Sequence, residues 1–239
     1  MNIDVLKEYA PMYLTAAGLT VRIALIGIAG SIILGLLCSL IRYLKIPVLK
    51  QITGIYIELS RNTPLLIQLF FLYFGLPKAG ILLSSETCAI TGLIFLGGSY
   101  MAEAFRSGLE AVPAIQIESA LSLGLTKGQV IGYILLPQAI SVSIPAFTAN
   151  IIFLIKETSV FSAVALADLM YTAKSLIGMS YNTDEALFML VLSYLGILLP
   201  ISVIFTLIER KLRYAGFGNK SIIRGKKPHK ALRWIMGYR

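Results

Sequence analysis

The sequence predicts an all-α integral membrane protein with five transmembrane helices. Of its 239 residues, 57% are hydrophobic and 14% are charged, and the mean hydropathy is +0.81, which excludes a soluble domain of ordinary composition. Five apolar runs are long enough to cross a bilayer as helices. Lysine and arginine gather between alternate runs and after the last one, a pattern typical of a multi-pass protein.

The first two runs flank a short basic segment. The first is the uncharged run 23–41, whose 19 residues would extend about 28 Å as a helix, close to the thickness of the hydrocarbon core. The chain begins without the basic segment and cleavage pattern of a signal peptide, so we expect this run to be retained as a transmembrane helix. The second run covers roughly 52–76, and Pro64 is expected to bend it.

The other three runs complete the expected bundle. The third covers about 87–101, and the Gly-Gly-Ser sequence at 97–99 predicts a close helix contact. The fourth covers about 137–155 and the fifth 186–208, each with a proline inside it. Five transmembrane segments place the two termini on opposite sides of the membrane.

Basic residues predict which side of the membrane each loop occupies. The segments expected in the cytoplasm contain Arg42, Lys45 and Lys50, then Arg106 and Lys127, and finally ten basic residues and no acidic one from Arg210 onward. The other loops are neutral or acidic and are expected outside. The N-terminus of this cell-membrane protein should therefore lie outside and its C-terminus in the cytoplasm.

The basic stretch from Arg210 onward accounts for the net charge. The rest of the chain has a net charge of −1, so the overall charge of +9 gives no reason to expect a nucleic acid partner. Trp234, Ile235 and Met236 fit a tail that lies on anionic lipid headgroups, at about 1 kcal/mol per basic residue. The alternative is a disordered tail whose charge only sets the orientation.

Few residues suit catalysis or metal binding. Cys38 and Cys88 lie in or beside apolar runs without metal or redox spacing, and the single histidine, His229, lies in the basic tail. The sequence contains no Gly-x-x-x-x-Gly-Lys-Ser/Thr loop for nucleotide phosphates. We therefore expect no cofactor, no metal site and no enzymatic activity in this chain, and energy for any transport must come from a partner.

A polar segment, 118–137, lies between the third and fourth runs. Gly124 is placed to end a helix that begins near Pro113, and Thr126 is placed to cap a second short helix that Pro137 closes. The segment resembles the cytoplasmic signature loop of ABC importer permeases, Glu-Ala-Ala, three residues, Gly, nine residues, Ile-x-Leu-Pro. The corresponding residues are Glu118, Ser119, Ala120, Gly124, Ile134, Leu136 and Pro137.

In that family the loop docks onto a separate ATPase, so the resemblance implies that these seven residues couple the chain to a partner. Ser119 departs from the usual alanine. An ordinary amphipathic loop between membrane helices is the alternative.

Four further segments resemble permeases for polar amino acids, of the histidine, glutamine, arginine and cystine type. They are 57–71 (IELSRNTPLLIQLFF), 100–108 (YMAEAFRSG), 136–139 (LPQA) and 154–159 (LIKETS). Together the resemblance covers about 15–217. Ser60-Arg61-Asn62 stands where an aromatic residue and Arg-Gly are more usual, and Ile144-Pro145 replaces a double proline, which puts the local geometry in doubt.

The resemblance implies the type I ABC importer permease fold. We expect a transmembrane permease domain over 1–217, with a coupling loop at about 113–137, and a basic cytoplasmic tail over 218–239. The implied partners are a dimer of ABC ATPase subunits that binds ATP and Mg, a second permease subunit of the same or a related chain, an extracytoplasmic amino acid binding protein and the lipid bilayer.

Charged residues near the expected membrane segments are candidates for function, because ionisable groups are expensive there. Glu58 and Arg61, and likewise Glu103 and Arg106, are spaced i, i+3 and are expected to form structural ion pairs.

A group at the end of the fourth run suits a zwitterionic amino acid. Glu157 could hold the substrate ammonium, with Lys156, Thr158 and Ser159 beside it, if the helix breaks at Thr158. The alternative is that these residues lie in outer water. Asn150 is a weaker candidate, explained equally well by a polar helix contact.

Two other functions fit parts of the sequence. A sensor or assembly protein on the same fold would be expected to have a degraded signature loop, whereas this loop departs only at Ser119. A secondary transporter would be expected to have more helices or an internal repeat. Residues 160–185 are too polar to cross the membrane and are either contacts for a binding protein or a simple surface loop.

Overall fold

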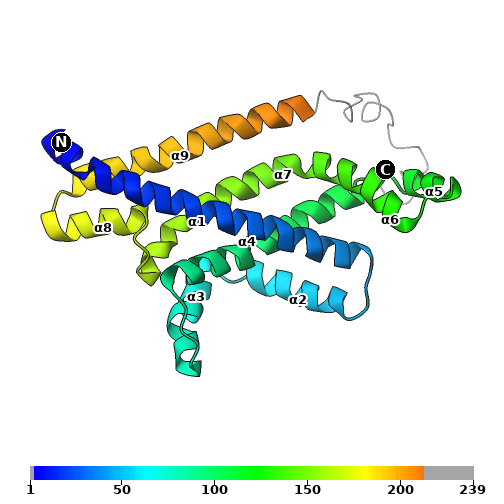
Figure 1. Ribbon diagram of the computed structural model, residues 1–239, viewed down its shortest axis with the longest axis horizontal. Coiled ribbons are helices and arrows are strands. Elements are labelled where there is room, and N and C mark those ends of the chain that lie inside the picture. The colour runs from blue at the N-terminus through cyan, green and yellow to red at the C-terminus, as the bar shows by residue number, and fades with distance from the viewer. Residues whose placement is uncertain (1–2, 213–239) are drawn as a thin grey trace, which may run out of the picture.

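The computed structural model describes residues 3–212, and every regular element in this range is a helix, as the sequence predicts. The basic tail expected over 218–239 lies outside the described residues. Four helical stretches are long and apolar enough to cross a membrane, namely Ile3–Tyr43, Ser85–Glu110, Lys127–Val164 and Thr183–Glu209. They extend along the long axis of the molecule (Figure 1).

Shorter elements connect and extend the long helices. The long helices are α1 (Ile3–Tyr43), α4 (Ser85–Glu110), α7 (Leu136–Glu157) and α9 (Thr183–Leu212). The short α-helices are α2 (Leu49–Arg61), α3 (Leu65–Phe70), α5 (Ala114–Ser122), α6 (Lys127–Val130) and α8 (Leu169–Ser180). The π-helical turns are η1 (Phe71–Gly75) and η3 (Ile131–Leu135), and the 3₁₀ helices are η2 (Leu76–Ala79) and η4 (Thr158–Val164).

The second expected transmembrane helix, over 52–76, is not a continuous helix. α2 ends at Arg61, and Pro64 is extended, with φ −58° and ψ 143°, before α3 begins. Because proline has no N–H to donate to the preceding turn, the helix cannot continue through it. α3, η1 and η2 then leave the bundle sideways (Figure 1). The described residues therefore contain four long membrane helices where the sequence predicts five.

The expected close contact at 97–99 is confirmed. A Cβ atom on Gly97 would collide with the side chains of Ser31 on α1 and Leu154 on α7, and one on Gly98 would lie 2.6 Å from the hydroxyl of Tyr56 on α2. Glycine at these two positions therefore allows α4 to pack centrally among α1, α2 and α7.

The expected end of a helix at Pro137 is wrong. α6 continues through the π-helical turn η3 into α7, in which Pro137 occupies the first turn. In η3 the N–H of Leu136 bonds to the carbonyl of Ile131, five residues back. Pro137 follows this wider turn directly, so its missing N–H falls where the regular α-helical bonding is already interrupted.

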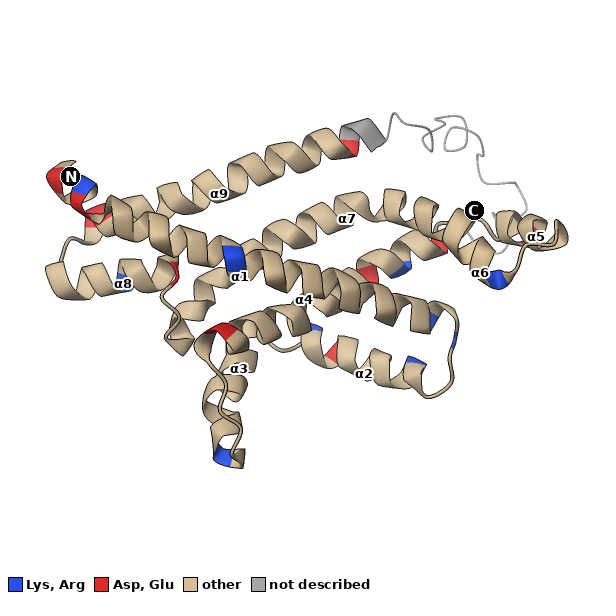
Figure 2. Ribbon diagram, in the orientation of Figure 1, with Lys and Arg blue, Asp and Glu red and all other residues tan. Residues whose placement is uncertain are grey.

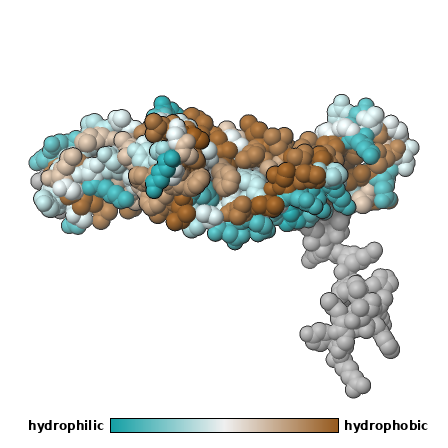
Figure 3. All heavy atoms as spheres, turned by 90° about the horizontal axis from the view of Figure 1, so that it is seen from below, coloured by the Kyte–Doolittle hydropathy of each residue, from teal (hydrophilic) through white to brown (hydrophobic). Residues whose placement is uncertain are grey.

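The middles of α7 and α9 carry no charged residue, whereas α1 carries one basic residue at its middle and α4 carries several charges in its second half (Figure 2). Apolar side chains cover much of the middle of the face seen in Figure 3. One end carries α5 and α6, and the opposite end carries α8 and the start of α1 (Figure 1). This distribution of charge is that of a bundle whose middle lies in lipid.

Candidate functional site

A groove of about 290 Å³ opens where α2, α3, α4 and α7 approach one another. Its polar lining residues are Arg61, Asn62, Thr63, Tyr100 and Glu157. Its apolar lining residues are Pro64, Leu65, Leu66, Leu96, Phe153 and Val160. Because a basic and an acidic side chain share a mostly apolar groove, it is suited to a small ligand with two opposite charges.

Arg61 reaches the groove because α2 ends there. Its guanidinium carbon lies 5.3 Å from the centre of the Tyr100 ring on α4, within the range of a cation–π interaction. The ion pair expected between Glu58 and Arg61 does not form in the part of the chain that the structure describes. The chain breaks directly after Arg61, and the Glu58 carboxylate instead accepts a hydrogen bond from Asn62 Nδ2 at 3.3 Å.

Glu157 lies on the opposite wall of the groove, as the last residue of α7. The helix changes there from α to 3₁₀, so η4 begins at Thr158, where the sequence anticipates a break. The Glu157 side chain is half-buried. Within the described residues, neither Glu157 nor Arg61 takes part in a salt bridge. Among the described residues the groove thus contains a basic and an acidic side chain without a salt-bridge partner, although the charge of Arg61 also acts on Glu103 of α4.

The other residues predicted to bind substrate lie outside the groove. Lys156 is exposed and Ser159 is half-buried, and neither lines it. Thr158 is buried and donates to a backbone carbonyl of its own turn at 2.7 Å. Asn150 donates to the backbone carbonyl of the groove residue Tyr100 at 3.2 Å, as a polar contact between helices would.

The second predicted ion pair is part of a larger network. Arg106 lies 2.7 Å from Glu103, as their spacing predicts, and 2.8 Å from Glu110. Arg42 on α1 lies 2.9 Å from the other oxygen of Glu103. These contacts tie α1 to α4 just before the chain enters α5.

Residues 113–137, which we call the coupling unit, contain the predicted signature loop. α5 begins after Pro113, and Gly124 follows its last turn with φ 85°. The N–H of Gly124 bonds to the Leu121 carbonyl at 3.0 Å, and the N–H of Leu125 to the Ala120 carbonyl at 3.2 Å. This pair of bonds is the Schellman motif, and it confirms that the helix ends at Gly124.

α6 begins with a complete capping box. The Thr126 hydroxyl accepts from the Gln129 N–H at 3.4 Å, and the Thr126 N–H donates to Gln129 Oε1 at 2.8 Å. The predicted cap at Thr126 is therefore confirmed.

The predicted coupling residues differ in exposure. Glu118, Ser119, Gly124 and Pro137 are exposed, Ile134 and Leu136 are half-buried, and Ala120 is buried. Large apolar side chains of the same unit are exposed as well, namely Ile115, Leu121, Leu123 and Tyr133. An apolar surface of this kind beside polar residues is typical of a protein–protein contact.

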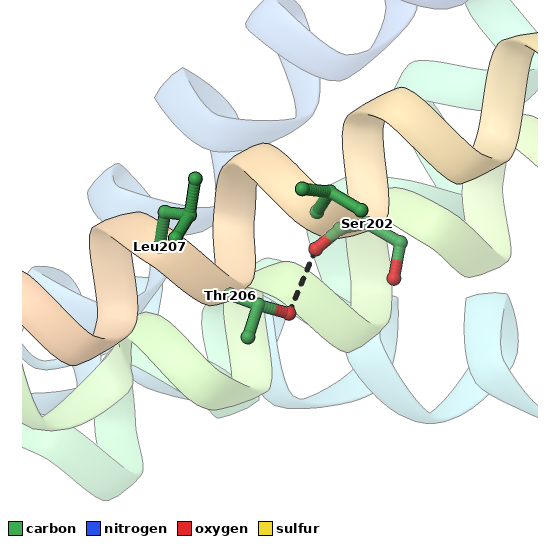
Figure 4. Close-up of a pocket in the computed structure, with 4 residues that line it drawn as sticks. Ser202, Thr206 and Leu207 are labelled. Atoms are coloured by element: carbon green, nitrogen blue, oxygen red, sulfur yellow. Dashed lines mark hydrogen bonds between the residues drawn. The ribbon is translucent and has the colours of Figure 1, made fainter.

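A shallow hollow on α9 is lined by Ser202, Val203, Thr206 and Leu207. The Thr206 hydroxyl donates to the Ser202 carbonyl at 2.8 Å, within the same helix (Figure 4). All four residues come from one helix and none is charged, so this hollow offers nothing to orient a ligand.

Asp168 lies between η4 and α8, outside the long membrane helices, and is completely buried. One carboxylate oxygen caps α8 by accepting from the Tyr171 N–H at 2.8 Å, and the other has no hydrogen-bond partner in the described part of the chain. Burial raises the pKa of this carboxyl to about 7. Although the sequence places Asp168 in a segment that could contact a binding protein, its burial keeps it from such a contact.

Comparisons with known proteins agree with this geometry. Residues 27–214 match the family described as "Binding-protein-dependent transport system inner membrane component". The chain is 33% identical to the probable amino-acid ABC transporter permease protein PatM of Vibrio harveyi, over 90% of the chain and 97% of the relative. It is 32% identical to the probable glutamine ABC transporter permease protein GlnM of Bacillus subtilis (strain 168), over 89% of the chain and 98% of the relative.

Solved structures show the same fold. A chain from the crystal structure of an amino acid ABC transporter with histidines superposes with a TM-score of 0.81, at 29% identity, over 88% of this chain and 99% of that chain. A chain of the MetNI methionine ABC transporter, in an inward-facing conformation, superposes with a TM-score of 0.74 at 20% identity, over 86% and 98%. The second likeness concerns the fold alone.

Proposed function

Because this chain belongs to the family of binding-protein-dependent transport system inner membrane components, we propose that a polar amino acid crosses the inner membrane along the groove between Arg61 and Glu157. The chain is a permease subunit of an amino acid ABC importer, and its ATPase is a separate chain that binds ATP. It works in a complex with ATPase subunits and permease partners.

The observation that carries this proposal is the pair of opposite charges in one groove. A free amino acid presents a carboxylate and an ammonium on the same carbon atom. Arg61 can hold the carboxylate with its planar pair of N–H donors, and Glu157 can accept from the ammonium. Unpaired charges are costly within the membrane. A ligand that pairs with both Arg61 and Glu157 is therefore favoured over one that pairs with neither.

Uptake by variants of the two residues tests the groove. The complex that co-purifies with the tagged chain would be reconstituted into liposomes with its binding protein, with L-glutamine and L-histidine as labelled probes. Each of Glu157→Gln and Arg61→Gln removes one charge-assisted contact worth roughly 1.5–3 kcal/mol, so the KM of uptake should rise about tenfold or more. Glu8→Gln, the same change at an exposed residue near the start of α1, is the control. Uptake by Glu157→Gln that equals the wild type would overturn the proposal.

We propose that the coupling unit docks onto the ATPase. Its exposed residues, with Glu118 and Gly124 among them, form a compact surface at the end of the bundle. Coupling of this kind is mechanical, because closure of the ATPase dimer moves α5 and α6 and through them α4 and α7. It requires no catalytic residue in this chain.

The direction of the helices supports five membrane crossings, with the N-terminus outside. α1 and α4 both run toward the end that carries the coupling unit (Figure 1). The chain must therefore return across the membrane between them, and α2 with α3 makes that return with a break at Pro64. Labelling of single cysteines from outside tests this topology: Ser84→Cys should react and Lys45→Cys should not.

The opposite end of the bundle suits the extracytoplasmic binding protein. Met179 and Tyr181, at the end of α8, are 80% and 86% exposed. Tyr181 caps the end of α8 in the left-handed conformation, with φ 55°. An exposed aromatic residue is a common anchor in protein contacts.

A further inference from the structure

The break between α2 and α3 leaves backbone carbonyls without their usual donors. In an α-helix the carbonyl of Ser60 would accept from the N–H of residue 64, but residue 64 is proline. The carbonyl of Leu59 accepts from the Thr63 hydroxyl at 2.8 Å instead. Since unpaired buried carbonyls are costly, the conformation of this break depends on which side chains replace the missing N–H groups.

Gln68, one turn into α3, supplies the donors for two carbonyls at the break, those of Ser60 and Thr63. Its Nε2 atom donates to the carbonyl of Ser60 at 3.1 Å and to the carbonyl of Thr63 at 2.9 Å. The side chain is 8% exposed. These two carbonyls stand on either side of Arg61 and Asn62 in the sequence. A single amide group therefore hydrogen-bonds to both ends of the short segment that carries the guanidinium.

The other half of the amide shows which property of Gln68 is used. Oε1 is buried and has no hydrogen-bond partner among residues 3–212. Turning the amide over would place this oxygen against two carbonyl oxygens, which repel it. The contribution of Gln68 is therefore its NH₂ group, and the site requires two N–H donors on a side chain of this length.

We propose that Gln68 is a positioning residue that aims Arg61 into the groove. By fixing the carbonyls of Ser60 and Thr63, it sets the direction in which α2 ends and thereby holds the Arg61 guanidinium over Tyr100. Gln68 does not line the groove and touches no ligand there. The inference rests on the proposed role of Arg61 in holding the substrate carboxylate.

A double-mutant cycle tests the inference. Labelled L-glutamine and L-histidine would be bound to the detergent-purified permease–ATPase complex without its binding protein. Gln68→Met keeps the length of the side chain and removes both donors, so we expect binding to weaken about tenfold, the value of two modest hydrogen bonds. Gln51→Met, on the exposed side of α2, is the control and should bind as the wild type does.

The double variant of Gln68 and Arg61 distinguishes a positioning role of Gln68 from a general structural role. If Gln68 acts through Arg61, adding Gln68→Met to Arg61→Gln should cause no further loss of binding. Losses that multiply in the double variant would overturn the inference. Gln68→Glu provides a second variant of the same shape, and because its carboxylate faces two carbonyls, it should weaken binding at least as much as Gln68→Met does.

The outcomes also distinguish this inference from the proposed function. If Arg61→Gln binds both amino acids as the wild type does, the assignment of Arg61 fails. If Arg61→Gln binds weakly and both Gln68 variants bind normally, only the role of Gln68 fails. L-Glutaminamide, in which an amide replaces the α-carboxylate, gives a further readout. Its binding should be the same in Gln68→Met as in the wild type, whereas a generally distorted groove would weaken its binding as well.

Discussion

The groove and the coupling unit are both built where a helix stops, but the two helices stop by different means. α5 ends at Gly124, whose positive φ lets two backbone N–H groups close the last turn. α2 ends at Arg61, and the carbonyl of Ser60 is satisfied by the side chain of Gln68, on another helix. The end of α5 is complete within its own residues, whereas the end of α2 depends on the placement of α3.

This difference matters for the work of each region. A helix end that is closed by its own backbone keeps its shape when its surroundings move, which suits a unit that transmits motion from one chain to another. A helix end held by a neighbouring helix changes shape when that neighbour moves. The direction of Arg61 can therefore follow a displacement of α3, which under the proposed function would change the hold of the groove on the substrate.

The largest expected effect comes from Gly124→Pro. Proline fixes φ near −65°, far from the 85° found here, and lacks the N–H that bonds to Leu121. Transport in proteoliposomes should be abolished while membrane insertion remains normal. Gly18→Ala on α1, outside the coupling unit, is the control, because a Cβ there would meet open space.

Glu118→Lys tests the same surface without touching the backbone. Reversing this exposed charge should abolish transport and reduce co-purification of the ATPase. ATP-dependent uptake that is unchanged in Gly124→Pro or in Glu118→Lys would exclude the coupling unit from the ATPase contact.

The start of α8, at Asp168, is held both by a local cap and by a contact from another helix. Its buried carboxyl group leads us to expect a pH-dependent stability. Its carboxylate caps α8 locally, whereas the N–H of Leu169 donates to the Thr20 hydroxyl on α1 at 3.3 Å. The folded protein holds a proton with a pKa of about 7, where the ordinary value is 3.8. The free energy of unfolding is highest below pH 3.8 and falls by roughly 1.4 kcal/mol per pH unit as the pH rises from there to about 7. Once the pH has passed 7, this stabilisation is lost.

The melting temperature of the purified complex between pH 5 and 8 is the measurement. In the wild type it should fall as the pH rises. Asp168→Asn keeps the capping oxygen and cannot ionise, so this part of the slope should disappear. Asp184→Asn, which removes an exposed carboxylate of α9, serves as the matched control. Equal slopes in the wild type and Asp168→Asn would show that the buried carboxyl does not titrate in this range.

The sequence predicts the coupling unit better than the groove, because helix caps act locally whereas the groove depends on tertiary packing. Pro113, Gly124 and Thr126 are correct markers of α5 and α6, because caps act within one turn. The expected second membrane helix over 52–76, bent at Pro64, is instead interrupted there, since apolar composition does not tell a bent helix from one that breaks and turns sideways at a proline. Pro64 marks the break, but the direction that the chain takes after it depends on packing against the rest of the bundle.

The groove required knowledge of the tertiary structure. Lys156, Glu157 and Thr158 are adjacent in sequence, yet successive helical residues point about 100° apart, and only Glu157 lines the groove. The i, i+3 spacing predicts a pair between Arg61 and Glu58, and both lie on α2, but the Glu58 carboxylate accepts from Asn62 and the Arg61 guanidinium lies over Tyr100 instead. A signal for Arg61 was present, since a charged residue three positions before a proline stands at a free helix end.

The smallest expected effect tests whether the coupling unit is as independent as its local bonds suggest. Thr126→Ala removes the cap of α6, which should cost about 1 kcal/mol and raise hydrogen exchange in α6 roughly fivefold. Because the capping box involves only Thr126 and Gln129, exchange in α3 and in the residues of the groove should not change. Thr206→Ala, which removes a hydroxyl bonded only within α9, should leave α6 unaffected. If the loss of protection spreads from α6 to α3, the two regions are energetically linked in the resting protein and motion of the ATPase need not begin at α5.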